Sequence, residues 1–113
     1  MRDLRALKWS NREKKIARQA FERAYQRECD AIRERVSAML AELANANDVW
    51  RVHDFLSEKR REVEEKYDYR YSVLIFVFAR LLREGWLDEP ELDGLQEDKI
   101  SAIKEMANLW YAD

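Results

Sequence analysis

The sequence has little glycine, proline or cysteine, and each shortage excludes a class of protein. Its 113 residues include 2 Gly, 1 Pro and 1 Cys. Few Gly and Pro residues mean few tight turns, so we expect long uninterrupted elements. The single cysteine, Cys29, excludes an internal disulfide and a cysteine-rich zinc site, and it is typical of a reducing compartment. These features predict a cytoplasmic protein.

The sequence also lacks a long apolar run and a strong net charge. Its longest apolar stretch, VLIFVFA from Val73 to Ala79, is far shorter than the roughly 20 residues that cross a bilayer, and no N-terminal signal is evident. The 21 basic and 23 acidic residues give a formal net charge of -2, so no overall field attracts nucleic acid or anionic lipid. We expect neither a nucleic-acid partner nor integral membrane association.

What the sequence does contain is the pattern of amphipathic helices, with 39% charged and 47% hydrophobic residues. Residues 1 to 9 resemble a loose arm, and SNRE, from Ser10 to Glu13, is typical of a capping box that begins a helix. Apolar residues then recur at helical spacing as far as NAND. They are Ile16, Ala17, Ala20, Phe21, Ala24, Tyr25, Ile32, Val36, Met39, Leu40 and Leu43.

This first helix is predicted to be roughly 50 Å long, which exceeds the diameter of a domain of this size. A hairpin with the next helix would cover only part of its apolar stripe. The uncovered part predicts a homodimer.

The NAND segment, Asn45 to Asp48, is expected to end the first helix and to supply Asn47 or Asp48 as the N-cap of a second helix that ends near Lys66. The apolar face of this second helix comprises Val49, Val52, Phe55, Leu56 and Val63. At about 100° per residue, the opposite side carries Trp50, Asp54, Ser57 and Arg61, with His53 and Arg60 beside them.

The C-terminal part is predicted to be a compact helical head. Residues 67 to 84 are expected to form a buried helix, although their β-branched and aromatic centre would also suit a strand. Gly85 is the expected left-handed stop, after which Trp86 and Leu87 pack back. Asp88 is expected to cap a short turn through Pro90 and Leu92. A last helix after Gly94 carries Ile100, Ile103, Met106, Ala107 and Trp110. The prediction is therefore a single all-α domain, with an elongated stem at about 10–66 and a head at about 67–113.

Catalysis and metal binding find little support in the sequence. His53, Asp54 and Ser57 have the residue types of a hydrolytic triad. Asp54 directly follows His53, so we expect it not to face the imidazole, and no Gly-rich turn can supply an oxyanion hole. One histidine among solvated carboxylates lacks the ligands for zinc, and no Gly-rich loop could hold a phosphate or a cofactor. We expect neither an enzyme nor a cofactor.

The remaining hypothesis is an interaction surface on the second helix. An exposed Trp50 would be typical of an interface hot spot, and Asp54, Arg60 and Arg61 could make charge-assisted contacts. Two alternatives stay open at this point. Trp50 could be buried beneath a neighbouring helix of a dimer, and the chain could be a helical dimeric adaptor.

Three motifs resemble a known family. HDFLS followed by KR, then KYDYRY, then LLREGWL lie within Asp48 to Leu87, and this region closely resembles the core of the cyanobacterial fluorescence recovery protein family. Weaker likeness extends to residues 9–10, 21–28 and 92–103.

The resemblance implies an all-helical homodimer without a cofactor that regulates photoprotection. Its implied partner is the photoactivated orange carotenoid protein, bound through that protein's C-terminal domain. Binding would speed the return from the red to the orange form and help release it from the phycobilisome. The implied site residues are Trp50, His53, Asp54 and Arg60 on the stem, and Phe76 in the head, which we expect to be partly exposed.

The chain also differs from the family pattern. Its first helix is highly charged, with Arg33 near the expected dimer seam, and its end carries Trp110 and Tyr111. Family relatives occur in bacteria without phycobilisomes, so a homologue acting on a different partner is an open alternative. The implied location is the cytoplasm, with a peripheral position on the cytoplasmic side of the thylakoid membrane as an alternative.

Overall fold

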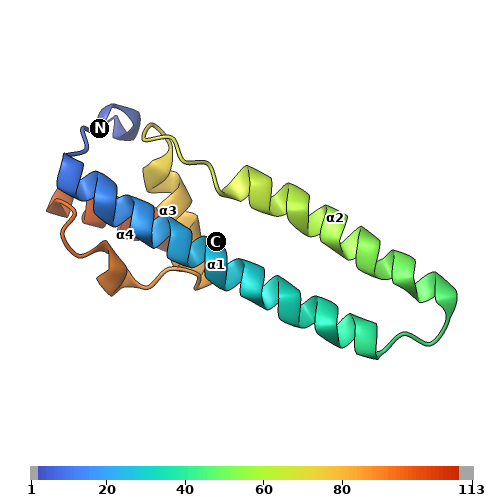
Figure 1. Cartoon of the computed structure of the whole chain (residues 1–113). Coiled ribbons are helices and arrows are strands. Elements are labelled where there is room, and N and C mark those ends of the chain that lie inside the picture. Colours follow the sequence, from blue (N-terminus) through green and yellow to red (C-terminus); the bar gives the residue numbers. More distant parts are fainter. Residues whose placement is uncertain (1–2, 110–113) are drawn as a thin grey trace.

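The computed structural model describes residues 3–109, and these residues form helices and no strand, which confirms the all-α prediction. The α-helices are α1 (Asn11–Ala41), α2 (Val49–Lys66), α3 (Leu74–Glu84) and α4 (Glu97–Leu109) (Figure 1). Short 3-10 turns lie at Leu4–Ala6, Ala46–Asp48 and Glu89–Leu92. The molecule measures 55 × 32 × 21 Å, with a radius of gyration of 17.0 Å. A compact domain of this length would have about 13 Å, so the shape is elongated.

The capping box that begins α1 is present as predicted. The Ser10 hydroxyl oxygen accepts a hydrogen bond from the Glu13 backbone N–H at 3.1 Å, and Glu13 Oε1 accepts one from the Ser10 N–H at 3.0 Å. Two backbone donors of the first turn are therefore satisfied reciprocally. The helix is about 46 Å long at 1.5 Å per residue. It ends at Ala41, so Leu43 follows the helix.

The turn between α1 and α2 is held by side chains of the NAND segment. Asp48 Oδ2 accepts hydrogen bonds from the backbone N–H groups of Ala44 at 2.8 Å and Asn45 at 3.2 Å. The Asp48 carboxylate thus points back into the turn and makes no cap bond to α2. Asp48 nevertheless occupies the N-cap position of α2, which confirms one of the two predicted N-cap residues. The predicted end of α2 at Lys66 is confirmed.

The segment before α3 corrects the predicted helix from residue 67, because α3 begins only at Leu74. Tyr67 and Tyr69 both meet Phe21 edge-on, with ring centroids 5.4 and 4.9 Å away. This segment is not helical, and Tyr67 and Tyr69 both pack on α1 through Phe21. Aromatic packing therefore outweighs helix propensity in this segment.

The end of α3 agrees with the prediction. Gly85 has a φ of 85°, and the backbone N–H groups of Trp86 and Leu87 donate to the Leu81 carbonyl at 3.0 and 3.2 Å. This left-handed stop turns the chain back, so Leu87 becomes fully buried. The following turn precedes α4, which buries Ile103 and Ala107 as predicted. The predicted packing of Trp110, and Tyr111 beside it, lies outside the described residues.

Two regions of the molecule differ in how much they bury. Among the described residues, every buried apolar side chain except Val52 belongs to one cluster, formed by α3, α4, the turns beside them and the first part of α1. Trp9 belongs to this cluster, and Leu4 and Leu7 pack against it, so residues 4–9 are not a loose arm as predicted. Residues 1 and 2 lie outside the described residues. We call residues 3–28 and 66–109 the packed end, and residues 29–65 the distal hairpin (Figure 1).

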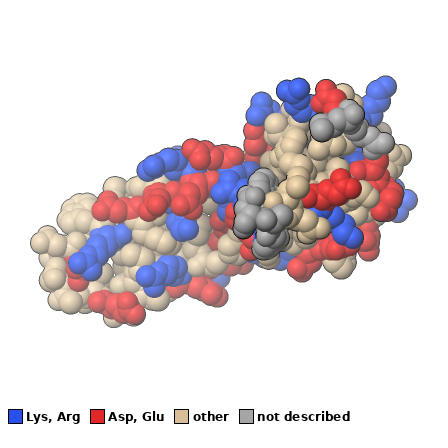
Figure 2. Space-filling model, turned by 180° about the vertical axis from the view of Figure 1, so that it is seen from behind, with Lys and Arg blue, Asp and Glu red and all other residues tan. Residues whose placement is uncertain are grey.

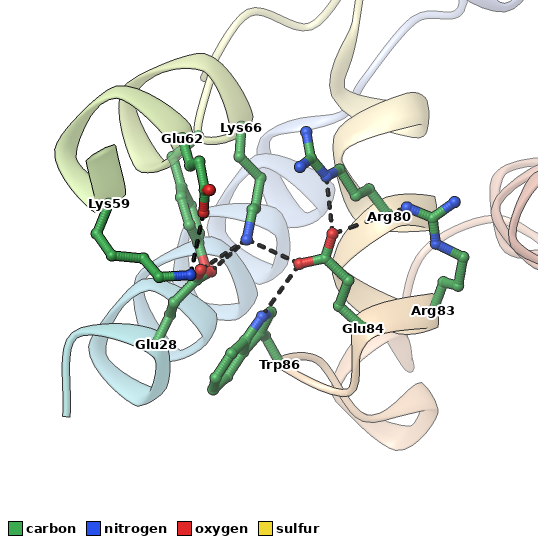
Figure 3. Close-up of polar contacts among 9 residues, drawn as sticks. Glu28, Lys59, Glu62, Lys66, Arg80, Arg83, Glu84 and Trp86 are labelled. Carbon is green, nitrogen blue, oxygen red and sulfur yellow. Dashed lines mark hydrogen bonds and ion pairs between the residues drawn. The ribbon is translucent and has the colours of Figure 1, made fainter. Parts of the chain in front are cut away.

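An ionic cluster of the packed end lies at the point where α2 leaves the distal hairpin (Figure 3). The Lys66 ammonium at the end of α2 donates to both Glu28 carboxylate oxygens, at 2.8 and 2.6 Å, and to Glu84 Oε1 at 2.7 Å. Glu28 also accepts from the Tyr67 hydroxyl at 2.9 Å, and Glu84 from the Trp86 indole N–H at 3.2 Å. This cluster fixes α2 to α1 and α3 at one end of the hairpin.

Candidate docking and dimer surface

The predicted site residues of α2 lie on the solvent side of the distal hairpin. Trp50 is 62% exposed, and His53, Asp54 and Arg60 are exposed as well. Ser57 and Arg61 share this exposed side, as their helical spacing predicted. The structure thus places Trp50 in solvent and does not bury it within its own chain.

Trp50, His53 and Asp54 form one small group within a single turn of α2. The Trp50 and His53 rings lie edge to face, with centroids 6.2 Å apart at 77°. His53 Nδ1 lies 3.4 Å from Asp54 Oδ1. The expectation that Asp54 does not face the imidazole was wrong, because its short side chain bends back to the preceding ring. At 3.4 Å in full solvent this contact is weak.

Arg60 and Phe76 lie apart from that group. Arg60 lies further along α2. Its Nε donates to Oε1 of Glu64, one helical turn away, at 3.0 Å, and this ion pair is exposed. Phe76 lies on α3 in the packed end and is partly buried, as expected. Its side chain is not one of those that pack on the buried core cluster. The site residues therefore form a surface over two regions and do not converge on one pocket.

A second surface was only partly recognised in the sequence. Large apolar side chains are exposed along one side of the distal hairpin and its base. They include Tyr25, Leu40, Leu43, Val49 and Leu56. Tyr25, Cys29 and Ile32 of α1 line a groove together with Leu56, Arg60 and Val63 of α2, with a volume of about 250 Å³. The two helices thus present their apolar residues on the same side.

The spacing along this groove is that of a coiled-coil seam. In α1, positions 25, 29, 32 and 36 follow the alternating four- and three-residue steps of a heptad, and Leu40 lies four residues further on. In α2, the same steps connect Val49, His53, Leu56, Arg60 and Val63. We call these ten positions the seam. His53 and Arg60 are its polar members. Counting heptads in the sequence could have identified both as seam positions.

Arg33 lies beside the seam and is exposed, with its guanidinium 3.7 Å from Asp30 Oδ1. Its charge remains in solvent in the isolated subunit. Arg33, which was predicted to lie near the dimer seam, therefore lies at its edge. The seam positions of α1 themselves are apolar or cysteine.

The surface of the hairpin carries neither a predominantly positive nor a predominantly negative charge. Figure 2 shows basic and acidic side chains interspersed along the hairpin, with uncharged surface between them. Within residues 3–109 no cluster of His, Cys, Asp and Glu is arranged to hold a metal ion, and no helix of that range is long and apolar enough to cross a membrane. The chemistry that the surface offers is directional charge pairing around an exposed aromatic side chain.

Comparison with known proteins finds similarity to one family over most of the chain. Residues 9–107 match the family model described as photoprotection regulator fluorescence recovery protein. The Fluorescence recovery protein of Synechocystis sp. PCC 6803 is 48% identical over 101 residues, which cover 89% of this chain and 93% of that protein.

Solved structures agree with the fold. The structure of the Fremyella diplosiphon Fluorescence Recovery Protein is similar with a TM-score of 0.84 at 44% identity, and the Synechocystis structure with 0.84 at 46% identity. Each comparison covers 89% of this chain and 99% of the other. The elongated hairpin with a packed end is therefore shared over nearly the whole length.

Proposed function

Because the chain belongs to the fluorescence recovery protein family of photoprotection regulators, we propose that it binds the photoactivated orange carotenoid protein. Binding through that protein's C-terminal domain accelerates the return from the red to the orange form. It also helps to release the carotenoid protein from the phycobilisome. The proposed site of action is the cytoplasm, with the cytoplasmic face of the thylakoid membrane as an alternative.

The exposed Trp50 is the observation that carries this proposal beyond family membership. A tryptophan that is 62% exposed costs free energy in water, and tryptophan and arginine are enriched at interface hot spots. His53 and Asp54 surround it with groups that can give or accept charge-assisted hydrogen bonds. Phe76 on α3 is the proposed contact of the packed end.

The proposed mechanism is a population shift without covalent chemistry or a cofactor. A partner that binds the transition geometry of re-closure more tightly than the open red form lowers the barrier between them. Trp50 is proposed to supply these contacts directly, and Arg60, which is a seam position, either directly or by holding the dimer geometry. Asp54 is proposed to pair with a cation of the partner or to hold the dimer geometry. No group on this surface needs to donate or remove a proton.

We further propose that the active form is a homodimer joined through the seam. The distal hairpin buries only Val52 among its own side chains, while several large apolar side chains of the seam remain exposed. A stable interface buries about 800 Å² on each partner, and a second copy of the same apolar stripe could cover such an area. Dimerisation would leave Trp50 on the outer side, because it lies about 100° around α2 from Val49.

The function is tested by following the absorbance decay of the red carotenoid protein in the dark. Adding this protein should accelerate the decay, and Trp50→Ala or Arg60→Ala should each slow the assisted recovery about tenfold if each side chain supplies about 1.4 kcal/mol. Arg51→Ala is the matched control, because the Arg51 and Arg60 side chains lie on the same helix and are both 81% exposed. The control should keep wild-type recovery.

An unchanged decay at excess protein, together with absence of binding, would contradict the proposed partner. It would favour a dimeric adaptor or a family homologue acting on a different protein in an organism without phycobilisomes. Equal slowing by the Arg51 and Arg60 variants would instead show that general charge, and not this surface, determines recovery.

A further inference from the structure

A second surface lies on the packed end, away from Trp50. It comprises Lys14, Lys15 and Arg18 on the outer side of α1, with Tyr69 and Tyr71 beside them. We call these five residues the basic tyrosine patch. The three cations are exposed, and none forms an ion pair with another residue in the range 3–109. Most other cations on the surface have a carboxylate partner, such as Arg27 with Glu91.

The position of these cations near the start of α1 gains no stability from the helix macrodipole. Lys14 and Lys15 lie within the first turns of α1, where the helix macrodipole favours acidic side chains. The one acidic residue of the first turn, Glu13, is buried and engaged by Lys99 at 3.0 Å, so it does not neutralise them. Because these charges gain nothing from the helix or from an ion-pair partner, binding is a better explanation for them than stability.

The tyrosines hold two of the cations in place. The Arg18 guanidinium lies 3.8 Å from the centre of the Tyr69 ring, and the Lys14 ammonium lies 5.3 Å from that of Tyr71. Tyr69 is itself fixed, with its ring 4.9 Å from Phe21 and its hydroxyl donating to the Lys14 carbonyl at 3.4 Å. A guanidinium stacked on a ring keeps its N–H edge free for a carboxylate. Less side-chain entropy is then lost on binding.

The patch carries positive charge only. Burial and the neighbouring Tyr71 raise the pKa of Tyr69 above its ordinary value, so its phenol stays neutral at physiological pH. Glu22 lies one turn beyond Arg18 on α1, and Asp68 lies beside Tyr69 in the chain, where Arg70 binds it. Acidic side chains therefore border a small cationic area.

We propose that the basic tyrosine patch docks a short acidic segment of a partner protein, through its Asp or Glu carboxylates. The acidic border and the formal net charge of -2 disfavour an extended anionic surface such as a bilayer, whereas a few carboxylates fit between the bordering acids. This inference goes beyond the proposed function and does not depend on the carotenoid protein, since any acidic segment of matching size can test it.

The test uses a fluorescein-labelled peptide of ten glutamates and measures its anisotropy on titration with the full-length protein. The variant Lys14→Gln, Lys15→Gln, Arg18→Gln should bind the peptide about tenfold more weakly, since exposed charge pairs each contribute a modest share. The matched control is Arg5→Gln, Arg51→Gln, Lys104→Gln, which removes the same charge from cations with carboxylate partners. It should keep wild-type affinity. Tyr69→Leu, which removes the support under Arg18, should weaken binding by a smaller factor.

Three results would overturn the proposal. Equal loss in the patch variant and the control would assign binding to net charge. Equal affinity for a ten-glutamine peptide would exclude carboxylate recognition. Flotation with vesicles that contain phosphatidylserine, lost in the patch variant while the peptide does not bind, would assign the patch to a membrane surface.

Discussion

The packed end and the distal hairpin share helix α1 but differ in how many apolar side chains they bury. In the packed end, α3 and α4 close over the first part of α1, and side chains such as Phe78 and Leu74 have no exposed surface. In the distal hairpin, α1 and α2 run on past that core (Figure 1), and Val52 is the only side chain of residues 29–65 that is buried. One region has a core of its own, and the other lacks one.

The packed end is stabilised by contacts within the chain, whereas the exposed side chains of the hairpin are candidates for binding another protein. A helix pair needs further apolar contacts before its hydrophobic stripes are covered, and the hairpin has only the opposite helix. The candidate residues Trp50, His53, Asp54 and Arg60 all lie in this uncovered region. Substitutions should therefore act on folding in the packed end and on association in the hairpin.

The largest effect should come from the core of the packed end. Phe78 is fully buried, and Phe78→Ala should lower the free energy of unfolding by about 3–5 kcal/mol, because it removes apolar contacts and leaves a cavity. Chemical denaturation followed by far-UV circular dichroism would measure this change, and the melting temperature should fall by more than about 10 °C.

Phe76→Ala, two residues away on the same helix, is the matched comparison. Phe76 is partly exposed and lies outside the core cluster, so its truncation should cost less than half as much stability. Similar losses for both variants would make Phe76 a core residue and would remove it from the proposed contact surface.

The next effect should come from the ionic cluster at the base of the distal hairpin. The side chains of Lys66 and Glu28 are 4% and 6% exposed, so Lys66→Met leaves a buried carboxylate without its cation. Loss of one partner of a buried pair typically costs about 3 kcal/mol or more, whereas replacing both partners by apolar residues is often nearly neutral. The double variant Lys66→Met, Glu28→Met should therefore recover much of the loss in urea denaturation at pH 7.

The pH dependence of this loss provides a control. Burial opposes ionisation of Glu84, but hydrogen bonds from Lys66 and Arg80 outweigh it and lower its pKa. In the wild type, this contribution to stability is present above the ordinary glutamate pKa of 4.5 and is lost as pH falls through the lowered value. In Lys66→Met the Glu84 carboxylate loses a hydrogen bond that lowers its pKa and is protonated more readily, so the cost of the substitution should shrink between pH 7 and pH 4. A constant cost over this range would show that packing, and not charge, determines it.

The sequence was sufficient for features set by local chemistry. The capping box at Ser10, the left-handed stop at Gly85 and the exposed position of Trp50 each depend on residues a few positions apart, and the structure confirms all three. The start of α3 and the burial of Trp9 were predicted wrongly, because both depend on side chains distant in the chain. Phe21 packs against Tyr67 and Tyr69, and the Lys99 ammonium lies 5.1 Å from the centre of the Trp9 ring.

The candidate site was predictable in part for the same reason. Helical spacing put Trp50 and Asp54 on the outer side of α2 without any knowledge of tertiary contacts. Pairings such as Glu28 with Lys66 join residues 38 positions apart, and no spacing rule connects them. The roles of the five site residues were implied by family resemblance, and they stay predictions until the variants are measured.

The smallest effect on the stability of the subunit should come from a substitution in the seam. The same substitution should have the clearest effect on dimer formation. Leu56 is 41% exposed in the isolated hairpin, so Leu56→Glu removes little intramolecular burial and should change the stability of the dilute subunit by less than about 1 kcal/mol. In a dimer joined through the seam, the same change would bury a charge against the partner helix, which costs several kcal/mol. Light scattering at micromolar concentration should give a dimer mass for the wild type and a monomer mass for this variant.

Leu109→Glu is the matched control for this comparison, because Leu109 is 61% exposed on α4, outside the hairpin. The control should remain dimeric, and its melting temperature should rise with protein concentration as in the wild type, whereas that of Leu56→Glu should not. A dimer that survives Leu56→Glu but not Leu109→Glu would place association on the packed end. The distal hairpin would then carry exposed apolar residues for a partner other than a second copy, and Trp50 and the seam would form one continuous docking surface.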